Sequence, residues 1–139
     1  MSKAWKELEK QVADFFGGLR VVRIAYDEVA GDVIHPIYSI ECKYGGQVPK
    51  HLSPRVPTEI TVGFGRSRRR FRIVPSQFCE MDGKLLYYRT LGWVKKTLKT
   101  SHFLRDAIKQ AKRYNPTLTP LVCVKPKGRH GFMCIWEVK

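Results

Sequence analysis

Three ionisable residues within residues 31–43 have the types and spacing that metal-assisted hydrolysis of a phosphodiester requires. This stretch, GDVIHPIYSIECK, contains Asp32, Glu41 and Lys43. From residue 38 onward apolar and polar residues alternate, so a strand here would direct Glu41 and Lys43 to the same face. A tight reversal at His35-Pro36 would place the carboxylate of Asp32 alongside Glu41. Two carboxylates and an ammonium group would then converge.

These groups match the chemistry of a magnesium-dependent hydrolase. Carboxylate oxygens are the ligands that Mg²⁺ prefers, and a lysine can orient an attacking water molecule or neutralise the phosphate. The alternative is an exposed Glu-x-Lys pair that is only solvated. Here the apolar residues that flank Glu41 predict a central strand, on which a charged side chain needs a metal ion or a partner. We therefore predict Asp32 and Glu41 as metal ligands and Lys43 as a catalytic residue.

An amphipathic helix is predicted for residues 2–16, with Ser2 as its N-cap and Gly17-Gly18 at its end. Its apolar stripe consists of Trp5, Leu8, Val12, Phe15 and Phe16. Glu9 borders this stripe, whereas Glu7 points away from it. Glu9 is therefore a candidate for a further acid of the metal site, with a solvated helix-edge glutamate as the alternative.

Asp32, the triplet Glu41-Cys42-Lys43 and Glu9 resemble the active-site residues of the PD-(D/E)xK nuclease superfamily. The hairpin pattern DV-HP-S-ECK, the proline and leucine of residues 49–52, and Gln110-Ala111 in a later helix are most similar to archaeal-type Holliday junction resolvases and their phage-encoded relatives. The similarity covers residues 1–52 and about residues 102–139. Gly31 stands where the motif has proline, and residues 53–101 have no counterpart in the pattern.

The resemblance implies a restriction-endonuclease-like α/β fold: a mixed β-sheet flanked by helices, in one nuclease domain of residues 1–139 with a basic β-hairpin insertion at about 53–101. It implies a Mg²⁺-dependent endodeoxyribonuclease that resolves four-way DNA junctions, with Mn²⁺ able to substitute. Asp32 and Glu41 would bind the metal, Lys43 would position water, and Glu9 would assist. Gln110 would lie near the metal site. Because a resolvase cuts two symmetry-related strands, a homodimer is expected.

Two other functions stay open at this stage. A sequence-specific restriction enzyme or a repair or nicking nuclease would use the same residues, because one fold hosts many activities. A non-catalytic basic DNA-binding protein is disfavoured by the presence of all three of Asp32, Glu41 and Lys43. No phosphate-binding loop or dinucleotide-binding glycine pattern occurs, so no nucleotide cofactor is expected.

The charge of the chain predicts a polyanionic partner. The 139 residues carry a net charge of +14, and its distribution is uneven. Residues 1–43 have a net charge of −1, residues 44–101 of +9 and residues 102–139 of +6. The acidic groups thus gather at the predicted metal site, and the basic groups elsewhere can bind a phosphate backbone of branched double-stranded DNA. No apolar run or leader indicates a membrane or secretion, so a cytoplasmic location is expected, in the host cell if the chain is phage-encoded.

The remaining segments supply the predicted DNA contacts and the rest of the sheet. A proline- and glycine-rich loop at residues 44–57 carries Lys50 and Arg55, close in sequence to the catalytic strand. An antiparallel hairpin of residues 58–64 and 71–74 has Arg66, Arg68, Arg69 and Arg70 near its tip, where anions must offset the repulsion between them. These six residues are the predicted DNA contacts.

The second half of the chain is predicted from its periodicity. A strand is predicted at 84–89 after a turn at Asp82-Gly83, and a short helix at 91–100. A longer helix is predicted at 103–114, with Ser101 as its N-cap, followed by strands at 119–125 and 132–138. The four scattered cysteines lack the spacing of a zinc site and are expected to be core thiols.

Overall fold

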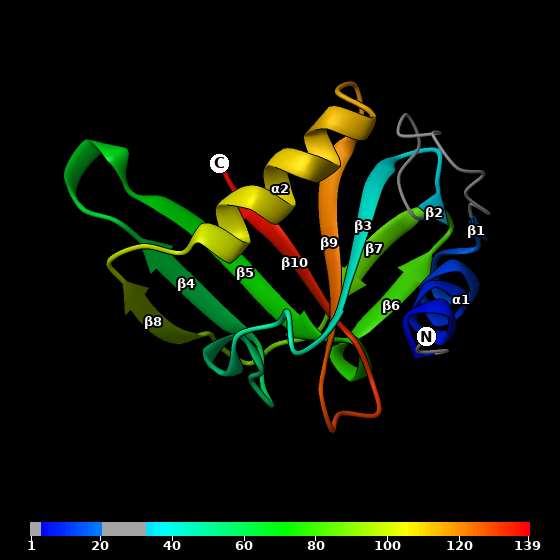
Figure 1. Ribbon diagram of the computed structural model, residues 1–139, viewed down its shortest axis with the longest axis horizontal. Helices are drawn as coiled ribbons and strands as arrows, with labels where there is room; N and C mark the ends of the chain where they lie inside the picture. Colours follow the sequence, from blue (N-terminus) through cyan, green and yellow to red (C-terminus); the bar gives the residue numbers. More distant parts are fainter. Residues whose placement is uncertain (1–3, 21–32) are drawn as a thin grey trace.

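The computed structural model describes residues 4–20 and 33–139, and within them the chain is an α/β protein with a mixed β-sheet (Figure 1). The two helices are α1 (Ala4–Phe16) and α2 (His102–Tyr114). The strands are β1 (Leu19–Arg20), β2 (Val33–Ile34), β3 (Tyr38–Gly45), β4 (Thr58–Val62), β5 (Arg69–Pro75), β6 (Cys79–Asp82), β7 (Leu85–Tyr88), β8 (Val94–Leu98), β9 (Thr119–Pro126) and β10 (Met133–Val138). None of the helices in these two ranges is long and apolar enough to cross a membrane.

Eight strands of the described chain form one sheet in the order β1-β2-β3-β9-β10-β5-β4-β8. The pairs β3–β9 and β4–β8 are parallel, and the other neighbours are antiparallel. The strands β6 and β7 form a separate two-stranded sheet. The predicted mixed sheet with flanking helices is thus confirmed at the level of an α/β class, and β3 lies inside the sheet between β2 and β9.

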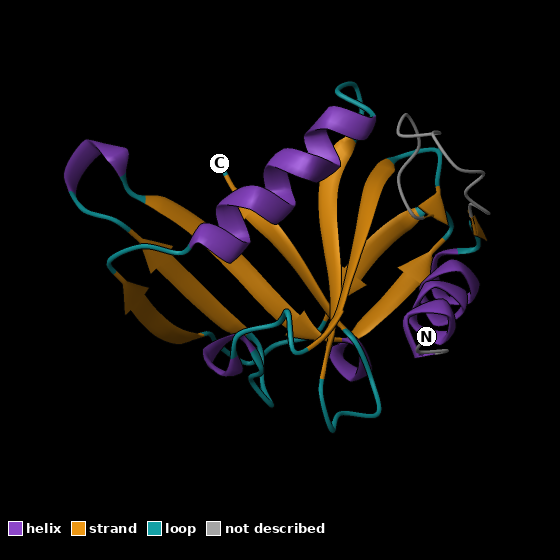
Figure 2. Cartoon of the chain, in the orientation of Figure 1, coloured by secondary structure: helices purple, strands orange, loops and turns teal. Residues whose placement is uncertain are grey.

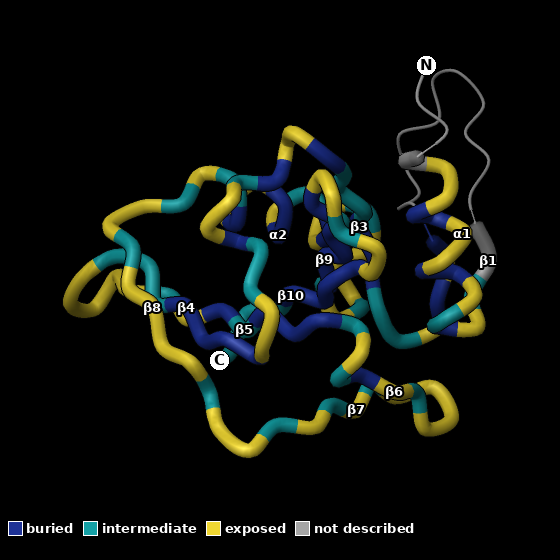
Figure 3. The backbone as a smooth tube through the Cα atoms, turned by 90° about the horizontal axis from the view of Figure 1, so that it is seen from below, coloured by how far each residue is buried: buried dark blue, intermediate teal, exposed yellow. Residues whose placement is uncertain are grey.

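The two faces of the sheet bury two separate apolar clusters. Helix α2 covers one face, where its buried Leu104 and Ile108 pack with Phe71, Val122 and other strand residues. Helix α1 and the β6–β7 hairpin cover the other face, where Leu8 and Val12 pack with residues such as Ile40. Seen from below in Figure 3, α2 and the β6–β7 hairpin lie on opposite sides of the sheet. Strict alternation along each strand explains both clusters, because successive side chains point to opposite faces.

Both predicted amphipathic helices are confirmed. Leu8, Val12 and Phe16 of α1 are buried, as the stripe predicts. The predicted cap Ser2 lies outside the described residues. At the start of α2, the Ser101 Oγ accepts a hydrogen bond from the Leu104 backbone N–H at 3.3 Å, which is the predicted N-cap interaction.

The helix predicted at residues 91–100 is wrong, because Val94–Leu98 form the edge strand β8. Val94 and Leu98 are four residues apart, and an even spacing puts two side chains on one face of a strand as well as on one face of a helix. Leu91 lies three residues before Val94, a spacing that fits one face of a helix but not one face of a strand. The side chain of Leu91 is fully exposed in the structure. Pairing with β4 supplies the backbone hydrogen bonds that decide in favour of the strand.

The basic insertion is built into the central sheet. The predicted antiparallel hairpin exists as β4 and β5, and the turn at Asp82-Gly83 joins β6 to β7. However, β5 pairs along its length with β10, from Met133 opposite Pro75 to Val138 opposite Arg70. The hairpin therefore does not project as an independent ribbon, and its strands extend the sheet that contains β3.

The cysteines are core thiols, as expected. Cys79, Cys123 and Cys134 are buried, and Cys42 is partly buried. The pKa of Cys79 is raised by a hydrogen bond between the Cys79 and Cys134 thiols and by burial. Because the thiolate is the form that binds metals and attacks electrophiles, this thiol is a packing group.

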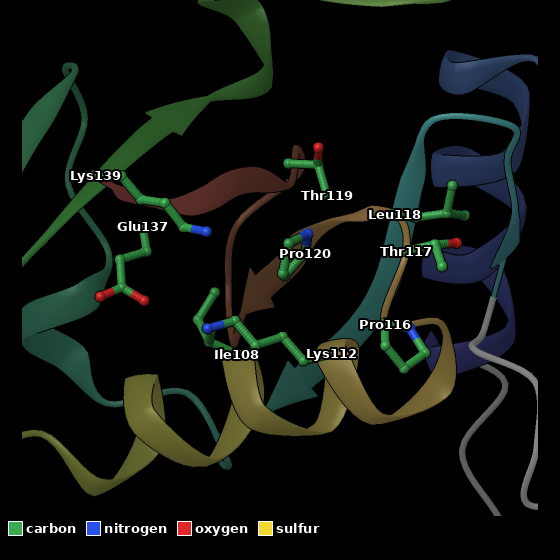
Figure 4. A pocket seen from close by; sticks show the side chains of 9 residues that line it. All are labelled: Ile108, Lys112, Pro116, Thr117, Leu118, Thr119, Pro120, Glu137 and Lys139. Carbon is green, nitrogen blue, oxygen red and sulfur yellow. The ribbon is translucent and has the colours of Figure 1, made fainter.

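An ion pair fastens the hairpin to the last strand, and it makes stability depend on pH. Arg69 Nη2 and Nε lie 2.7 and 2.8 Å from the Glu137 carboxylate, and the hydrogen bond to Arg69 lowers the pKa of Glu137. Glu137, Lys112 and Lys139 line a cavity of about 540 Å³ (Figure 4). The two lysines lower the pKa of Glu137 further. This cavity lies beside the start of β9 and contains none of the predicted site residues.

We expect Glu137→Gln to lower the free energy of unfolding by roughly 1 kcal/mol at pH 7, a figure reduced by solvent screening of the partly exposed pair. A depressed carboxyl pKa contributes stability above the unfolded value of about 4.3 and loses it as the pH falls through the folded value. The difference from the parent chain, measured by urea titration at pH 7 and at pH 3, should therefore be smaller at pH 3. A difference of equal size at both pH values would assign the effect to packing. The control variant is Glu80→Gln, which alters an exposed glutamate.

Candidate active site

The hairpin that carries the predicted site residues is held by a buried histidine. His35 is 3% exposed, and its Nδ1 accepts hydrogen bonds from the backbone N–H groups of Ile37 at 3.1 Å and Tyr38 at 3.2 Å. Burial lowers the pKa of His35, which keeps the imidazole neutral so that Nδ1 can accept. The predicted reversal at His35-Pro36 is confirmed, with a role for His35 that the sequence did not reveal.

The register of this hairpin brings β2 against the strand of Glu41. Val33, which follows Asp32 in the sequence, lies opposite Ile40, which precedes Glu41. Asp32 itself, the predicted second metal ligand, lies outside the described residues.

Glu41 and Lys43 project from the same face of β3, as predicted. The Lys43 Nζ lies 3.8 Å from the Glu41 Oε1. The Glu41 side chain is 4% exposed and that of Lys43 is 21% exposed, because α2 covers this face of the strand. A carboxylate at this depth gives up most of its hydration, which only specific polar partners can offset. The ammonium group of Lys43 therefore sits between a buried carboxylate and the solvent.

A short chain of hydrogen bonds on α2 fixes the position of the Lys43 ammonium group. Lys43 Nζ donates to Gln110 Oε1 at 2.9 Å, and Gln110 Nε2 donates to the Tyr114 hydroxyl at 2.8 Å. Lysine has only donors, so the amide oxygen of Gln110 must face it and the amide nitrogen must face Tyr114. Gln110, for which the resemblance predicts a place near a metal site, is thus hydrogen-bonded to Lys43. Tyr114 was not predicted, although its position four residues after Gln110 on a helix is a usable signal.

Ser39 ties the same face of β3 to the helix. Its Oγ donates a hydrogen bond to the backbone carbonyl of Ala111, and Ser39 is buried. Ser39, Glu41 and Lys43 alternate along the strand, so the first residue anchors α2 and the other two form the polar site beneath it. The distance between strand and helix at the site is therefore set by a polar contact as well as by packing.

Glu9 is buried at the edge of the apolar stripe of α1, where the periodicity placed it. It is 7% exposed. Helix α1 packs against β1, β2 and β3, and its apolar residues meet Ile40. Because Ile40 and Glu41 point to opposite faces of β3, α1 approaches this strand from the face opposite the Glu41–Lys43 pair.

The carboxylate of Glu41 and the backbone carbonyls of Ile40 and Cys42 are hard oxygen donors of the type that Mg²⁺ prefers. In residues 4–20 and 33–139, no group of three or more His, Cys, Asp or Glu side chains is arranged to hold a metal ion. The donor chemistry of β3 therefore fits Mg²⁺, and the predicted site also requires Asp32.

No protein-family model, curated protein or solved structure matches this chain.

A basic groove begins where β3 and β9 end, and we call it the 50/127 groove after the lysines on its two walls. It has a volume of about 680 Å³ and is lined by Lys50, Ser53, Arg55, Lys127, Arg129 and neighbouring glycines and prolines. Lys50 and Arg55 were predicted to bind DNA, whereas Lys127 and Arg129 come from the distant turn between β9 and β10. Figure 2 shows the loop after β3 and this turn at the same end of the sheet.

Arg129 joins the two walls of the 50/127 groove. Its Nη1 donates to the backbone oxygen of Ser53 at 3.1 Å and to the Ser53 Oγ at 3.0 Å, and its Nη2 donates to the Pro54 oxygen at 3.3 Å. These bonds connect the β9–β10 turn to the loop that carries Lys50 and Arg55. Three bonds from one planar guanidinium group make the shape of the groove well defined.

The arginines of the β4–β5 hairpin separate into two groups. Arg66 and Arg68 are exposed near the hairpin tip. Arg69 pairs with Glu137, and Arg70 Nη1 lies 3.9 Å from the Glu59 carboxylate. Carboxylates of the protein thus supply part of the compensating negative charge that the arginine cluster requires.

Glu59 is the centre of a second polar network, which sequence reasoning missed. It is 6% exposed and also pairs with Arg72 at 3.3 Å and with Lys95 at 3.8 Å. The Arg72 guanidinium group lies over the Trp93 ring, 4.5 Å from its centroid, and donates to the Tyr88 hydroxyl. This network holds β4, β5, β7 and β8 together, and it lies on the face of the sheet opposite Lys43.

Proposed function

We propose that this protein is a Mg²⁺-dependent, structure-selective endodeoxyribonuclease that resolves four-way DNA junctions by hydrolysis of phosphodiester bonds. The observation that carries the proposal is the buried Glu41 beside Lys43 on an internal strand, with the lysine held by Gln110. A carboxylate is a hard oxygen ligand for Mg²⁺, and an ammonium group beside it can orient a water molecule or offset negative charge on a phosphate. The resemblance to PD-(D/E)xK nucleases and a restriction-endonuclease-like arrangement of the sheet form part of the same proposal.

In this mechanism each residue has a distinct role. Asp32 and Glu41 would hold Mg²⁺ together with a backbone carbonyl of β3, and the ion would polarise the phosphate oxygens. Lys43 would orient the attacking water molecule and offset negative charge that develops on the phosphate. Gln110, itself oriented by Tyr114, would keep the ammonium group in place. Glu9, whose helix packs on the other face of β3, is given no step in this mechanism, and Mn²⁺ would substitute for Mg²⁺.

The substrate class is supported by charge. Residues 1–43 have a net charge of −1, so the net positive charge of the chain lies entirely in residues 44–139. Lys50 and Arg55 line a groove that begins two residues after Lys43. Arg66 and Arg68 extend the basic surface at the hairpin tip, whereas Arg69 and Arg70 are paired with Glu137 and Glu59. A resolvase must cut two strands related by the symmetry of the junction, so we propose a homodimer with two such sites.

A single cleavage assay tests the proposal. Purified protein is offered a four-way junction, a matched linear duplex and a single strand of the same sequence, each with Mg²⁺ and with EDTA. We expect paired cuts in the junction with Mg²⁺ and no cleavage of any substrate with EDTA. Equal cleavage of the linear duplex would favour a restriction, repair or nicking nuclease, and tight binding without cleavage would favour a non-catalytic DNA-binding protein.

A further inference from the structure

We propose that the 50/127 groove binds the sugar-phosphate backbone of a duplex DNA arm and leads it to Lys43 and Glu41. This inference rests on the proposed function for its active site, but the groove itself is argued from its own residues. It assigns a DNA-binding role to Lys127, which sequence reasoning did not identify, and a positioning role to Arg129.

The position of the groove relative to the candidate active site is set by the β3 backbone. Gly45, which lines the groove, is the last residue of β3 and lies two residues after Lys43, so the two positions are about 7 Å apart along the strand. Gly45 lies opposite Pro126 at the end of the parallel β3–β9 ladder. The floor of the groove is therefore continuous with the strand that carries the candidate active site.

The charge of the groove is of one sign. Lys50 and Arg55 stand on one wall and Lys127 and Arg129 on the other, and none of the described residues that line it is acidic. Lys50, Arg55 and Lys127 are exposed, so their charged ends are available to a ligand. Four cations around one groove repel one another, and a polyanion removes that repulsion.

The chemistry of the lining favours backbone contacts over base contacts. Apart from the four cations, the lining consists of glycine, proline, serine and valine, and the described groove contains no aromatic ring. Proteins that bind unpaired bases use aromatic rings as stacking surfaces, whereas Lys and Arg contacts to phosphates position a duplex without reading its sequence. The groove therefore fits the phosphates of a duplex and not splayed bases.

Hydrogen bonds within the protein define the shape of the groove. Arg129 connects its two walls through three hydrogen bonds, and the Val48 backbone N–H donates to the Gly45 carbonyl at 3.0 Å in the turn that opens the loop. Gly45 has a φ of +68°, a conformation that suits glycine. A preformed site does not have to be ordered at the moment of binding, which preserves affinity.

The test compares two triple variants with the same loss of charge. The first replaces Lys50, Arg55 and Lys127 by alanine, and the second, as control, replaces the exposed Lys10, Lys84 and Arg89 of α1 and the β6–β7 region. Affinity for a 5′-labelled 30-base-pair duplex and for a four-way junction is measured in EDTA between about 50 and 200 mM salt. Working without metal keeps the binding result independent of catalysis.

We expect the groove variant to bind DNA on the order of 10²-fold more weakly at 0.1 M salt. We also expect its slope of log K against log salt to be shallower by up to about 0.9 per lost contact. The control variant should keep most of the affinity and slope of the parent chain. The proposal would be overturned if both variants lost DNA affinity equally or if neither lost any. It would also be overturned if the parent chain bound a duplex RNA of the same sequence more tightly than the duplex DNA.

Two further variants separate charge from folding and from activity. A side chain at Gly46 would meet open space, so Gly46→Asp introduces a negative charge into the groove without a steric conflict, and Gly46→Ala is its neutral control. We expect only Gly46→Asp to weaken binding, with both variants melting at the same temperature. If the groove binds DNA but the protein is not a nuclease, these differences in binding persist although the parent chain cuts no substrate.

Discussion

Replacement of Glu41 by glutamine is expected to abolish Mg²⁺-dependent cleavage of a four-way junction while junction binding stays intact or becomes slightly tighter. Glutamine keeps the size of the side chain and one oxygen, but it removes the negative charge that a metal ion requires. Loss of a carboxylate beside the bound phosphate also lowers repulsion, which explains the unchanged or tighter binding. The same outcome is expected for Asp32→Asn. The measurement is a single-turnover cleavage assay paired with binding in EDTA.

The buried position of Glu41 makes a folding control necessary. Glu41 packs beneath α2 beside Lys43. The melting temperature of the Glu41→Gln variant should therefore be compared with that of the parent chain and with that of Glu80→Gln, which alters an exposed glutamate on β6. A folded Glu41→Gln protein with full activity would contradict the proposed site. A folded protein that loses junction binding together with cleavage would assign Glu41 to DNA binding.

The second large effect is expected for Lys43→Met, which should slow cleavage by about 10²- to 10³-fold, or roughly 3 to 4 kcal/mol of transition-state stabilisation. Methionine keeps an unbranched apolar stem and removes the ammonium group that Gln110 holds at 2.9 Å. A preorganised charge of this kind acts mainly on the transition state, so junction affinity in EDTA should change little. Single-turnover rates at saturating enzyme isolate this step.

The neighbours of Lys43 provide graded controls for that experiment. Tyr114→Phe removes the hydroxyl that accepts from Gln110, and Gln110→Leu removes the acceptor for Lys43 itself. We expect rate losses in the order Tyr114→Phe, Gln110→Leu, Lys43→Met, from smallest to largest, because each change lies one hydrogen bond closer to the ammonium group. If Lys43→Met costs only a few-fold in rate, Lys43 is a structural partner of Glu41 and not a catalytic residue.

Local patterns in the sequence determined the helices and the strand pair that carry the candidate site. The apolar stripe of residues 5–16, the N-cap at Ser101 and the alternation from residue 38 each depend on neighbours within a few positions. Periodicities of 3.6 and 2 residues report such local order directly. The shared face of Glu41 and Lys43 follows from the same rule, and it required no knowledge of the rest of the fold.

Contacts between distant segments decided the rest. The spacing of Val94 and Leu98 suits a helix and a strand equally, and only the open edge of β4 made residues 94–98 a strand. The partner of Arg69 is Glu137, 68 residues away, and the groove joins Lys50 to Lys127 across the parallel β3–β9 ladder. A sequence pattern carries no information on which strand edges meet. Charge pairing and groove formation therefore became visible only in the tertiary structure, because both depend on strand order and not on spacing along the chain.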